Sequence, residues 1–405
     1  MSEKKKVMIV AHFCDYGHEN SNNRFNYLAD LLEVHGYEVE LVTSSFSHRD
    51  KAQRVEEKTN NKKYKTTLIY EPSYQKNISL KRLFISHHVM ARNLRKYLKE
   101  CGRPDVVYCA IPSINVSEVV SEYTQKYSIP FAIDVQDLWP EAYRLILKNE
   151  RLYHLTTRTM IKRVDKVYRA ADQIVSVSDT YTERAKSVNM KCVNPITVYL
   201  GTEGAVFDSA VQNCTPKYLK PDNEFWLGYC GTLGHSYDLT IVMEAMKMIA
   251  ERKISNIRLM AIGSGPLEEK FKQKAAELGI SCTFTGKLPY DQMCAQLNQC
   301  DIAVNPIAKG AMQSIINKHA DYAIAGLPVV NTQECEEYRN LLKMYDCGIN
   351  CEPESVEQVA EAILSLARDE AMCATMRENA RKMGAEKFER SKTYQDILQG
   401  VQKLL

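Results

Sequence analysis

The 405-residue sequence lacks several features that would place it in a membrane or secreted class. It has no run of about 18 apolar residues, so we expect no transmembrane helix. The apolar run "VMIVA" after the first lysines is too short for a signal-peptide core, and no small-x-small cleavage site follows it. We therefore expect a cytoplasmic protein in which this run is the first buried strand.

The 13 cysteines include no C-x-x-C pair. The closest spacings, Cys347/Cys351 and Cys294/Cys300, lack the second pair that a zinc site needs, so we expect reduced thiols and no metal. There is also no Walker loop and no complete G-x-G-x-x-G. No helix-turn-helix, zinc-finger or RNA-binding signature accompanies the basic residues, which argues against a nucleic-acid partner.

The net charge of +3 conceals an asymmetry along the chain. Residues 1–200 carry 31 Lys and Arg against 23 Asp and Glu, whereas residues 201–405 carry 22 against 27. The window 51–100 alone has 13 basic and 4 acidic residues. Such a block favours contact with phosphates or with an anionic membrane surface, although a solvated helix and loop surface explains it equally well.

Apolar strand-like runs alternate with amphipathic helical stretches from end to end. Continuous apolar runs indicate strands buried on both faces, as in parallel sheets covered by helices. The pattern predicts an α/β protein with two Rossmann-like, doubly wound domains and a cleft between them. We expect an N-terminal domain over 1–203, a C-terminal domain over 204–384, and a final helix, about 385–405, that packs back on the first domain.

Three strand-to-helix loops in the second half contain glycines that would let backbone N–H groups approach a phosphate. The first, "YCGTLGHS", contains Gly231, Thr232 and Gly234, and the second, "AIGSGPLEE", contains Gly263 and Gly265. Each loop alone is a weak signal and favours a plain tight turn. Two such loops in one domain, with a third at Gly310, indicate a nucleotide.

The third loop leads into a helix that we expect to begin at about Ser314. Ser314, Lys318 and Asp321 then lie at i, i+4 and i+7, on one helical face. One interpretation is an N-cap serine and a Lys318–Asp321 ion pair worth about 0.3 kcal/mol. The other places Lys318 on a diphosphate and Asp321 on a ribose hydroxyl. Gly326 and Pro328 predict the end of this helix.

The first half has two polar loops that follow predicted strands. In "IDVQDLWPEAY", Gln136 and Asp137 would face the cleft, and Trp139 offers a flat surface for a sugar or lipid. In "GHENSNNRFNYLADLLEVHG", Ser21, Asn23 and Arg24 suggest an anion or sugar site, with helix capping as the alternative. A Trp that closes a domain edge is an equally common alternative. His87 and His88 lie in a basic helical stretch, and we expect no metal or catalytic role for them.

Taken together, these motifs resemble the retaining glycosyltransferases of family 4, which have the GT-B arrangement of two Rossmann-like domains. The resemblance covers nearly the whole chain. Its motifs occur in the expected order as "GYCGTLG", "IGSGPLEEKFK", "FTGKLPYDQM", "DIAVNPI" and "SIINKHADYAIAGLPVV", with "DLWPE" and "VSVSDTYTERA" in the first half. Within the family, the sequence is most similar to transferases of capsule and O-antigen assembly.

The resemblance implies roles for individual residues. The acidic pair of the family falls on Gln313 and Asp321, so Asp321 would bind the ribose, while Gln313 departs from the acid that contacts the donor sugar. Lys318 would bind the diphosphate, and the base would be read by the backbone at Lys287 and Leu288. The histidine that many relatives carry in the first domain is Gln136 here, beside Asp137.

The implied activity is transfer of a hexosyl or N-acetylhexosaminyl group, with retention, from a nucleotide-diphosphate sugar, most simply a UDP-sugar, to a lipid-linked or glycan acceptor. The catalytic set would be Asp137, Lys318 and Gln313, with the acceptor over Ser21, Asn23, Arg24, Gln136 and Trp139, and no metal or other cofactor. The N-terminal domain would contact the inner face of an anionic membrane. The alternatives are a non-catalytic nucleotide-sugar-binding subunit and a nucleotide-sugar 2-epimerase.

Overall fold

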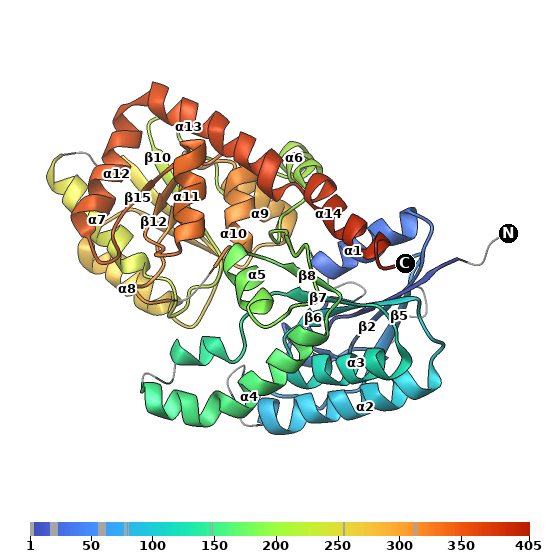
Figure 1. The fold of residues 1–405 in the computed structure, drawn as a ribbon. Coiled ribbons are helices and arrows are strands. Elements are labelled where there is room, and N and C mark those ends of the chain that lie inside the picture. The colour runs from blue at the N-terminus through green and yellow to red at the C-terminus, as the bar shows by residue number, and fades with distance from the viewer. Residues whose placement is uncertain are drawn as a thin grey trace. The chain divides into compact units, whose positions relative to one another are not determined.

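The computed structural model describes residues 4–405 apart from 17–22, 56–61, 77–78, 80, 146, 148, 254–255 and 312–313. The chain divides into two compact units (Figure 1). Unit 1 consists of Met1–Val198 with Tyr394–Leu405, and unit 2 consists of Tyr199–Thr393. Each unit is built on its own parallel sheet.

The sheet of unit 1 has seven strands in the order β5-β2-β1-β6-β7-β8-β9, all parallel. This order reverses direction between β1 and β6, as in the doubly wound nucleotide-binding folds. The strands are β1 (Lys6–Val10), β2 (Glu38–Ser44), β5 (Lys65–Ile69), β6 (Val106–Ile111), β7 (Phe131–Val135), β8 (Gln173–Ser176) and β9 (Ile196–Thr197). A separate antiparallel pair joins β3 (Phe46–Ser47) to β4 (Ala52–Gln53).

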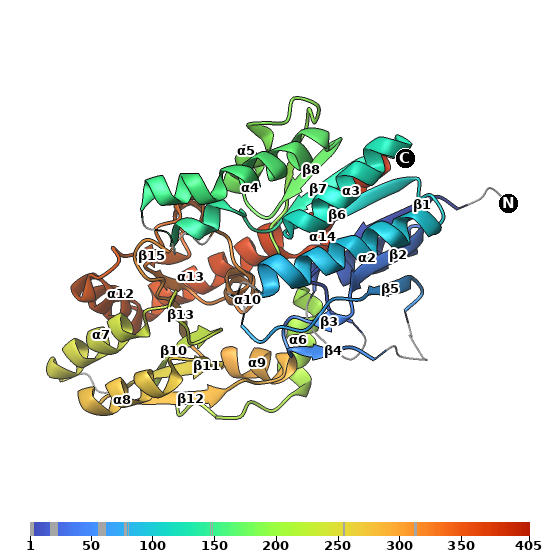
Figure 2. The same ribbon diagram turned by 90° about the horizontal axis from the view of Figure 1, so that it is seen from below.

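Helices cover both faces of this sheet. One face carries α2, α3, α4 and α5, and the other carries α1 and α14, so the C-terminal helix shares the core of unit 1 (Figure 2). Tyr394, Ile397, Leu398 and Val401 are the residues of α14 that are buried there. The helices are α1 (Arg24–Val34), η1 (Arg82–Ser86), α2 (His87–Glu100), α3 (Ile114–Tyr127), η2 (Glu141–Leu145), α4 (Glu150–Ala170), α5 (Asp179–Lys186) and α14 (Arg390–Gln402).

Unit 2 repeats the same winding with six parallel strands in the order β12-β11-β10-β13-β14-β15. Its strands are β10 (Phe225–Cys230), β11 (Ile257–Ile262), β12 (Cys282–Gly286), β13 (Ile302–Asn305), β14 (Val329–Asn331) and β15 (Gly348–Asn350). Its helices are α6 (Gly204–Asn213), α7 (Leu239–Glu251), α8 (Glu268–Leu278), α9 (Tyr290–Leu297), α10 (Asn317–Ile324), α11 (Glu336–Tyr345), α12 (Val356–Arg368), α13 (Glu370–Met383) and η3 (Gly384–Phe388).

The continuous apolar runs of the sequence form these strands because both faces of each sheet are covered. Every residue of β6, β7, β8 and β13 is buried. The predicted α/β class with two doubly wound sheets is therefore confirmed. The short edge strand β15, "GIN", gave no such signal, since three residues are too few to show a pattern. None of the described helices is long and apolar enough to span a membrane.

Candidate functional site

The sheet of unit 2 reverses its winding between β10 and β13. At such a point the loops that follow the two strands run in opposite directions, which leaves room for a ligand at the carboxyl ends of the strands. The loop after β10 contains Gly231, and the segment after β13 leads to α10. The glycine loop after β10 and the residues that follow β13 thus lie at the edge of the sheet where this fold binds ligands.

The glycines of the first two loops are required where the loops touch each other. A Cβ at Gly263 would lie 1.9 Å from the carbonyl oxygen of Gly231, and a Cβ at Gly265 would lie 2.3 Å from that of Leu233. Gly231 and Gly263 both have a φ of 138°, which side chains rarely adopt. By contrast, a Cβ at Gly234 would meet only a methyl group at 3.6 Å. Close packing of the two loops thus accounts for Gly263 and Gly265 without a ligand.

Lys318 of α10 is the most unusual charged group of unit 2. Its side chain is 6% exposed, and its ammonium has no hydrogen-bond partner in the part of the chain that the structure describes. The Nζ atom lies 4.1 Å from the ring centre of Tyr229 and 3.8 Å from that of Tyr237. It also lies beside the first loop, since a Cβ at Gly231 would be 3.1 Å from it. Two ring faces only partly replace the hydration of an ammonium.

Burial lowers the pKa of Lys318 to about 7, because the ammonium is removed from water and no carboxylate compensates it. The ion pair between Lys318 and Asp321, one of the two interpretations of the sequence, is not formed. A buried cation without an anion is costly, and an anionic ligand would supply what is missing.

The helix α10 begins at Asn317, so the expected start at Ser314 was wrong. Ile316 is extended and its N–H donates to Nδ1 of His319 at 3.3 Å, which caps the helix three residues later than expected. Ser314 therefore lies in the loop before the helix, where it is buried and its hydroxyl has no hydrogen-bond partner among the described residues.

Buried amide groups hold this loop in place. Nε2 of Gln333 donates to the carbonyl oxygen of Ser314 at 2.9 Å. Nδ2 of Asn305, at the end of β13, lies within hydrogen-bond distance of three groups: Oδ1 of Asn331 at 2.8 Å, Oε1 of Gln333 at 3.2 Å, and Nε2 of His319 at 3.2 Å. Fully buried networks of this kind fix the backbone to which they bind. The position of Ser314 is thus set by β13, β14 and the residues after β14.

The carboxylate of Asp321 has a different partner from the rings that surround Lys318. Its carboxylate accepts a hydrogen bond from the hydroxyl of Tyr290 at 3.1 Å, and that hydroxyl lies 2.7 Å from the hydroxyl of Thr202. Burial raises the pKa of Asp321 to about 6. The carboxylate is half-buried and keeps acceptor capacity for a further hydroxyl.

The remaining predicted residues of unit 2 lie at the same sheet edge. Thr232 and Lys287 are exposed and Leu288 is half-buried, after β10 and β12 respectively. A pocket of about 280 Å³ opens at this edge beside Tyr237, with Lys270 and Lys309 among its lining residues. Gln313 lies outside the described residues.

In unit 1, Gln136, Asp137 and Trp139 follow β7 directly. The indole N–H of Trp139 donates to Asp137 at 2.9 Å, and burial raises the pKa of Asp137. The Trp139 ring lies against Tyr143, with centroids 5.7 Å apart, and below the guanidinium of Arg82 at 5.1 Å. Trp139 is therefore partly packed rather than fully open. The Nε2 atom of Gln136 is buried without a partner among the described residues.

Two residues predicted to contact an acceptor have structural roles instead. Asn23 is the N-cap of α1 and accepts from the N–H groups of Phe25 and Asn26. Arg24 is 3% exposed, and its Nε donates to Asp134 at 2.7 Å. Because the guanidinium is enclosed with Asp134 in the core of unit 1, the expectation that it meets an acceptor was wrong. Ser21 lies outside the described residues.

A buried polar cluster in unit 1 was not predicted. Nε2 of His12 lies 2.7 Å from Glu71, and its Nδ1 lies 2.8 Å from the hydroxyl of Ser113. Burial opposes the charge of Glu71, but the charge and hydrogen bond of His12 outweigh it and lower the pKa of Glu71 to about 2. Polar residues directly after strands β1 and β6 were the available signal.

The same cluster brings donor atoms of His12, Glu71 and His87 within 4.8 Å of one another, a spacing that could hold a metal ion. However, both nitrogens of His12 are engaged by protein side chains, and Nε of Arg82 lies 3.3 Å from Nε2 of His87. A guanidinium at that distance opposes a second cation. We therefore interpret the cluster as a hydrogen-bonded network rather than a metal site.

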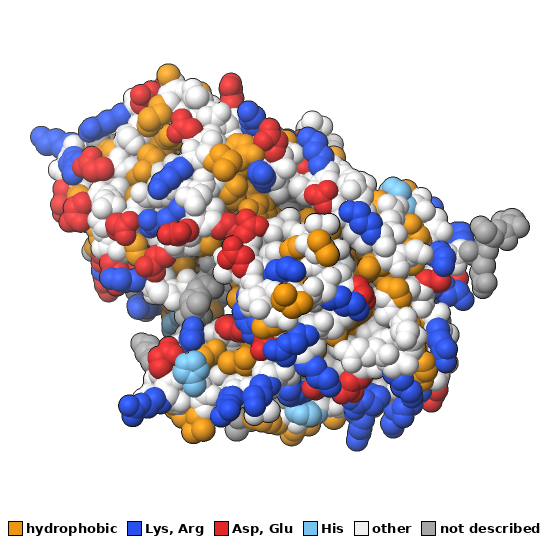
Figure 3. Space-filling model, viewed as in Figure 1, with side chains coloured by type: hydrophobic (Ala, Val, Ile, Leu, Met, Phe, Trp, Pro, Cys, Tyr) orange, Lys and Arg blue, Asp and Glu red, His pale blue; other side chains and the backbone are white. Residues whose placement is uncertain are grey.

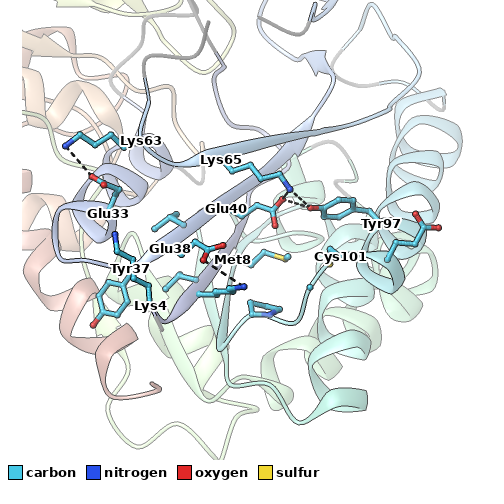
Figure 4. Close-up of a pocket in the computed structure, with 16 residues that line it drawn as sticks. Lys4, Met8, Glu33, Tyr37, Glu38, Glu40, Lys63, Lys65, Tyr97 and Cys101 are labelled. Carbon is cyan, nitrogen blue, oxygen red and sulfur yellow. Dashed lines mark hydrogen bonds and ion pairs between the residues drawn. The ribbon is translucent and has the colours of Figure 1, made fainter. Parts of the chain in front are cut away.

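A larger pocket of unit 1, of about 590 Å³, lies at the amino ends of β1 and β2 (Figure 4). Its charged side chains pair with one another, as Figure 4 shows for Lys65 with Glu40, whose charged atoms are 2.7 Å apart. Lys6 and Lys63 likewise face Glu38 and Glu33, at 3.9 and 4.0 Å. Because these charges compensate locally and the pocket is at the wrong edge for a doubly wound fold, we assign it no ligand.

Comparison with known proteins agrees with this geometry. Residues 212–383, which lie within unit 2, match the model of the family described as glycosyl transferases group 1, and this match supports a glycosyltransferase. A sequence comparison with curated proteins finds no match.

Solved structures show the fold. Sucrose-phosphate synthase from Thermosynechococcus elongatus superposes with a TM-score of 0.73 at 16% identity, and 99% of each chain is covered. Anabaena HepE, solved in complex with UDP, has a TM-score of 0.67 at 13% identity over 98% of this chain and 100% of that chain. WaaG, a glycosyltransferase of lipopolysaccharide biosynthesis, has a TM-score of 0.65 at 16% identity over 96% and 98%. The chain therefore has the GT-B fold.

Proposed function

We propose that the protein is a glycosyltransferase that transfers a sugar from a UDP-sugar to a lipid-linked or glycan acceptor. The observation that carries the proposal is the buried ammonium of Lys318, which has no anionic partner among the described residues and lies beside Gly231 at the switch point of the unit 2 sheet. The hydroxyl of Ser314, on the same segment, likewise has no hydrogen-bond partner in the part of the chain that the structure describes. HepE, which shares the fold, has been solved with UDP and with UDP-glucose.

In this proposal the donor diphosphate accepts hydrogen bonds from Lys318, Ser314 and the N–H groups of the Gly231 loop. An ammonium that is already in place and dehydrated stabilises the charge that develops on the leaving diphosphate, which is the largest contribution such a site can make. Asp321 would accept from the ribose, and the backbone at Lys287 and Leu288 would read the base. These residues need no metal to neutralise the diphosphate.

The acceptor would approach unit 1 at Gln136, Asp137 and Trp139, where a buried amide donor and a carboxylate follow β7. We further propose transfer of a hexosyl or N-acetylhexosaminyl group with retention, in capsular polysaccharide or O-antigen synthesis, by a cytoplasmic protein peripheral to the inner face of the membrane. Anomeric proton NMR of the product tests retention.

A thermal-shift screen of UDP-, GDP- and dTDP-sugars tests the donor assignment. A ligand present at 100 times its Kd stabilises the folded protein by about 2.7 kcal/mol, which is readily detected. We expect a shift with UDP-sugars that is lost in Lys318→Ala, because a charge-assisted hydrogen bond of about 1.5–3 kcal/mol is removed. Lys247→Ala is the matched control, since Lys247 of α7 belongs to the same unit but is exposed and pairs with Glu251. Equal shifts in both variants contradict the assignment.

A non-catalytic nucleotide-sugar-binding subunit is the second candidate. Gln136 favours it, since an amide cannot take up a proton where many family members carry a histidine. A 2-epimerase would use the same donor site. Incubation with UDP-sugar alone, followed by NMR, separates the three: an epimerase converts the donor sugar, a transferase releases UDP slowly by hydrolysis, and a binding subunit leaves the donor intact.

A further inference from the structure

The carboxylate of Asp321 is held by the hydroxyl of one tyrosine, Tyr290. Its Oδ1 atom accepts from that hydroxyl at 3.1 Å, while its Oδ2 atom has no hydrogen-bond partner among the described residues. Tyr290 is the first residue of α9 and lies two residues after Leu288. It therefore connects the segment proposed to read the base with the carboxylate proposed to hold the ribose.

The hydrogen bonds around Tyr290 run in one direction. An ionised carboxylate only accepts, so the single proton of the Tyr290 hydroxyl is donated to Asp321. The Tyr290 oxygen can then accept from the hydroxyl of Thr202, which lies 2.7 Å away. In such a chain each hydrogen bond polarises the next and strengthens it. Both hydroxyls thus favour a charged and fixed Asp321.

Thr202 is itself fixed by the backbone of unit 2. It is 1% exposed, its N–H donates to the carbonyl oxygen of Phe388 at 2.8 Å, and its carbonyl oxygen accepts from the N–H of Arg390 at 3.1 Å. A hydroxyl on such a segment loses little freedom when it bonds to Tyr290. The chain from Thr202 to Asp321 is therefore anchored at the end away from Asp321.

The surroundings of Asp321 work against one another. Burial raises the pKa of Asp321 to about 6, and the hydrogen bond from Tyr290 and the charge of Arg390 keep it from rising further. Without the tyrosine hydroxyl, the carboxylate would bind its proton more tightly and lose the bond that sets its orientation.

We propose that Tyr290 is a positioning residue of the donor site, which turns the Asp321 carboxylate so that Oδ2 accepts from a ribose hydroxyl of the nucleotide. It thereby makes the site selective for ribonucleotides over deoxyribonucleotides. The inference rests on the proposed donor function of Asp321 and adds how that carboxylate is oriented. A bond that only ties α9 to α10 would affect stability but not the choice between ribose and deoxyribose.

Calorimetric titrations with UDP and with its 2′-deoxy and 3′-deoxy analogues test the inference, since these ligands differ in one hydroxyl. The ribose preference is the ratio of the affinity for UDP to that for the weaker analogue. At pH 7 we expect a preference of about tenfold or more in wild type, the value of one charge-assisted hydrogen bond. In Tyr290→Phe it should fall to about threefold, the value of a neutral one.

The pH dependence of the ribose preference separates positioning from packing. In wild type the preference should rise as the pH passes about 6, where Asp321 loses its proton. Tyr290→Phe removes a hydrogen bond that lowers the pKa of Asp321, so the rise should move to higher pH. Protonation of the diphosphate or of Lys318 alters the affinities for UDP and its analogues alike and cancels in the ratio.

Among the described residues, the other titratable groups that face Asp321 keep their charge state in this range. Burial raises the pKa of the Cys230 thiol to about 12 and likewise raises the pKa of the Cys294 thiol, so both stay neutral. The guanidinium of Arg390 stays charged. A shift of the pH profile in Tyr290→Phe therefore reports Asp321.

The matched control is Tyr345→Phe. It removes a tyrosine hydroxyl of the same unit that donates to a carboxylate, Glu386, at 2.7 Å, but Glu386 is exposed. Figure 3 shows acidic and basic side chains next to one another on the surface of unit 2, where water screens such groups. The control should keep the wild-type preference at every pH. Circular dichroism melting curves establish that each variant is folded.

Thr202→Val is a second variant and should lower the preference in the same direction by a smaller factor, because Tyr290 keeps its bond to Asp321. An equal preference with an equal pH profile in wild type and Tyr290→Phe overturns the inference alone. An equal fall in Tyr290→Phe and Tyr345→Phe also overturns it. If wild type binds no UDP, or shows no ribose preference, the proposed donor site fails and this inference fails with it.

Discussion

Each unit contains a buried cation near the carboxyl edge of its sheet, and the two cations differ in what surrounds them. Arg24 in unit 1 donates to Asp134 at 2.7 Å and to the carbonyl oxygen of Val198 at 2.9 Å, and its guanidinium stacks on Tyr394. Lys318 in unit 2 has the rings of Tyr229 and Tyr237 and no acceptor among the described residues.

The difference separates a structural charge from one that awaits a ligand. Burial opposes the charge of both groups, but Asp134 outweighs it for Arg24 and raises the pKa of that guanidinium, whereas nothing comparable acts on Lys318. Removing one partner of a buried ion pair destabilises a protein strongly, and a lone buried cation already reduces its stability. Both residues looked like ligand-binding groups in the sequence, and only the surroundings distinguish them.

The largest expected effect comes from breaking the pair in unit 1. Asp134→Ala leaves Arg24 charged and buried without its anion, which should lower the free energy of unfolding by about 3–5 kcal/mol. Lys318→Met is the counterpart in unit 2 and should leave stability at pH 7 unchanged or raised, because it removes a lone charge. Urea denaturation of both variants measures the contrast. Similar losses of unfolding free energy in the two variants would contradict the distinction between the paired Arg24 and the unpaired Lys318.

The next largest effect should be a pH dependence of the free energy of unfolding that is caused by Lys318. The pKa of Lys318 falls from 10.5 to about 7 on folding, so between these values the unfolded chain binds the extra proton. Stability should therefore rise with pH in this window, by about 2 kcal/mol between pH 7 and 9 relative to Lys318→Met. Urea midpoints at pH 7, 8 and 9 provide the comparison, and parallel curves for the two proteins count against a neutralised Lys318.

A smaller effect is expected from crowding the ammonium. Gly231→Ala places a Cβ about 3 Å from Nζ of Lys318 at a φ of 138°, and should lower stability by about 1–3 kcal/mol and weaken UDP binding. Gly234→Ala is the control in the same loop, because its Cβ meets only one methyl group at 3.6 Å. Thermal melting with and without UDP reports both quantities. Equal behaviour of the two variants would show that Gly231 does not shape the site.

The smallest effect should come from unit 1. Trp139→Phe removes the indole donor to Asp137 but keeps a ring beside Tyr143, so stability should fall by about 1 kcal/mol. UDP affinity should not change, because Trp139 belongs to unit 1. Calorimetric titration of this variant with UDP checks the second point, and a large loss of affinity would contradict the assignment of the donor to unit 2 alone.

The residue pattern of the sequence predicted those parts of the fold that are determined by residues close together in the chain. Continuous apolar runs marked the buried strands, and Gly326 with Pro328 marked the end of α10. The start of α10 was wrong because Ser314 is held by Gln333, a contact across the sheet that no spacing along the chain reveals. The partner of Arg24 is likewise 110 residues away, and the rings around Lys318 come from β10 and the loop after it.

The central claim is that Lys318 binds the diphosphate of the donor. Calorimetric titrations of wild type and Lys318→Met with UDP and with uridine test it directly, since the two ligands differ only in the diphosphate. We expect UDP to bind wild type at least tenfold more tightly than uridine, and this preference to disappear in Lys318→Met while uridine affinity is retained. An unchanged preference for UDP in the variant would contradict the account.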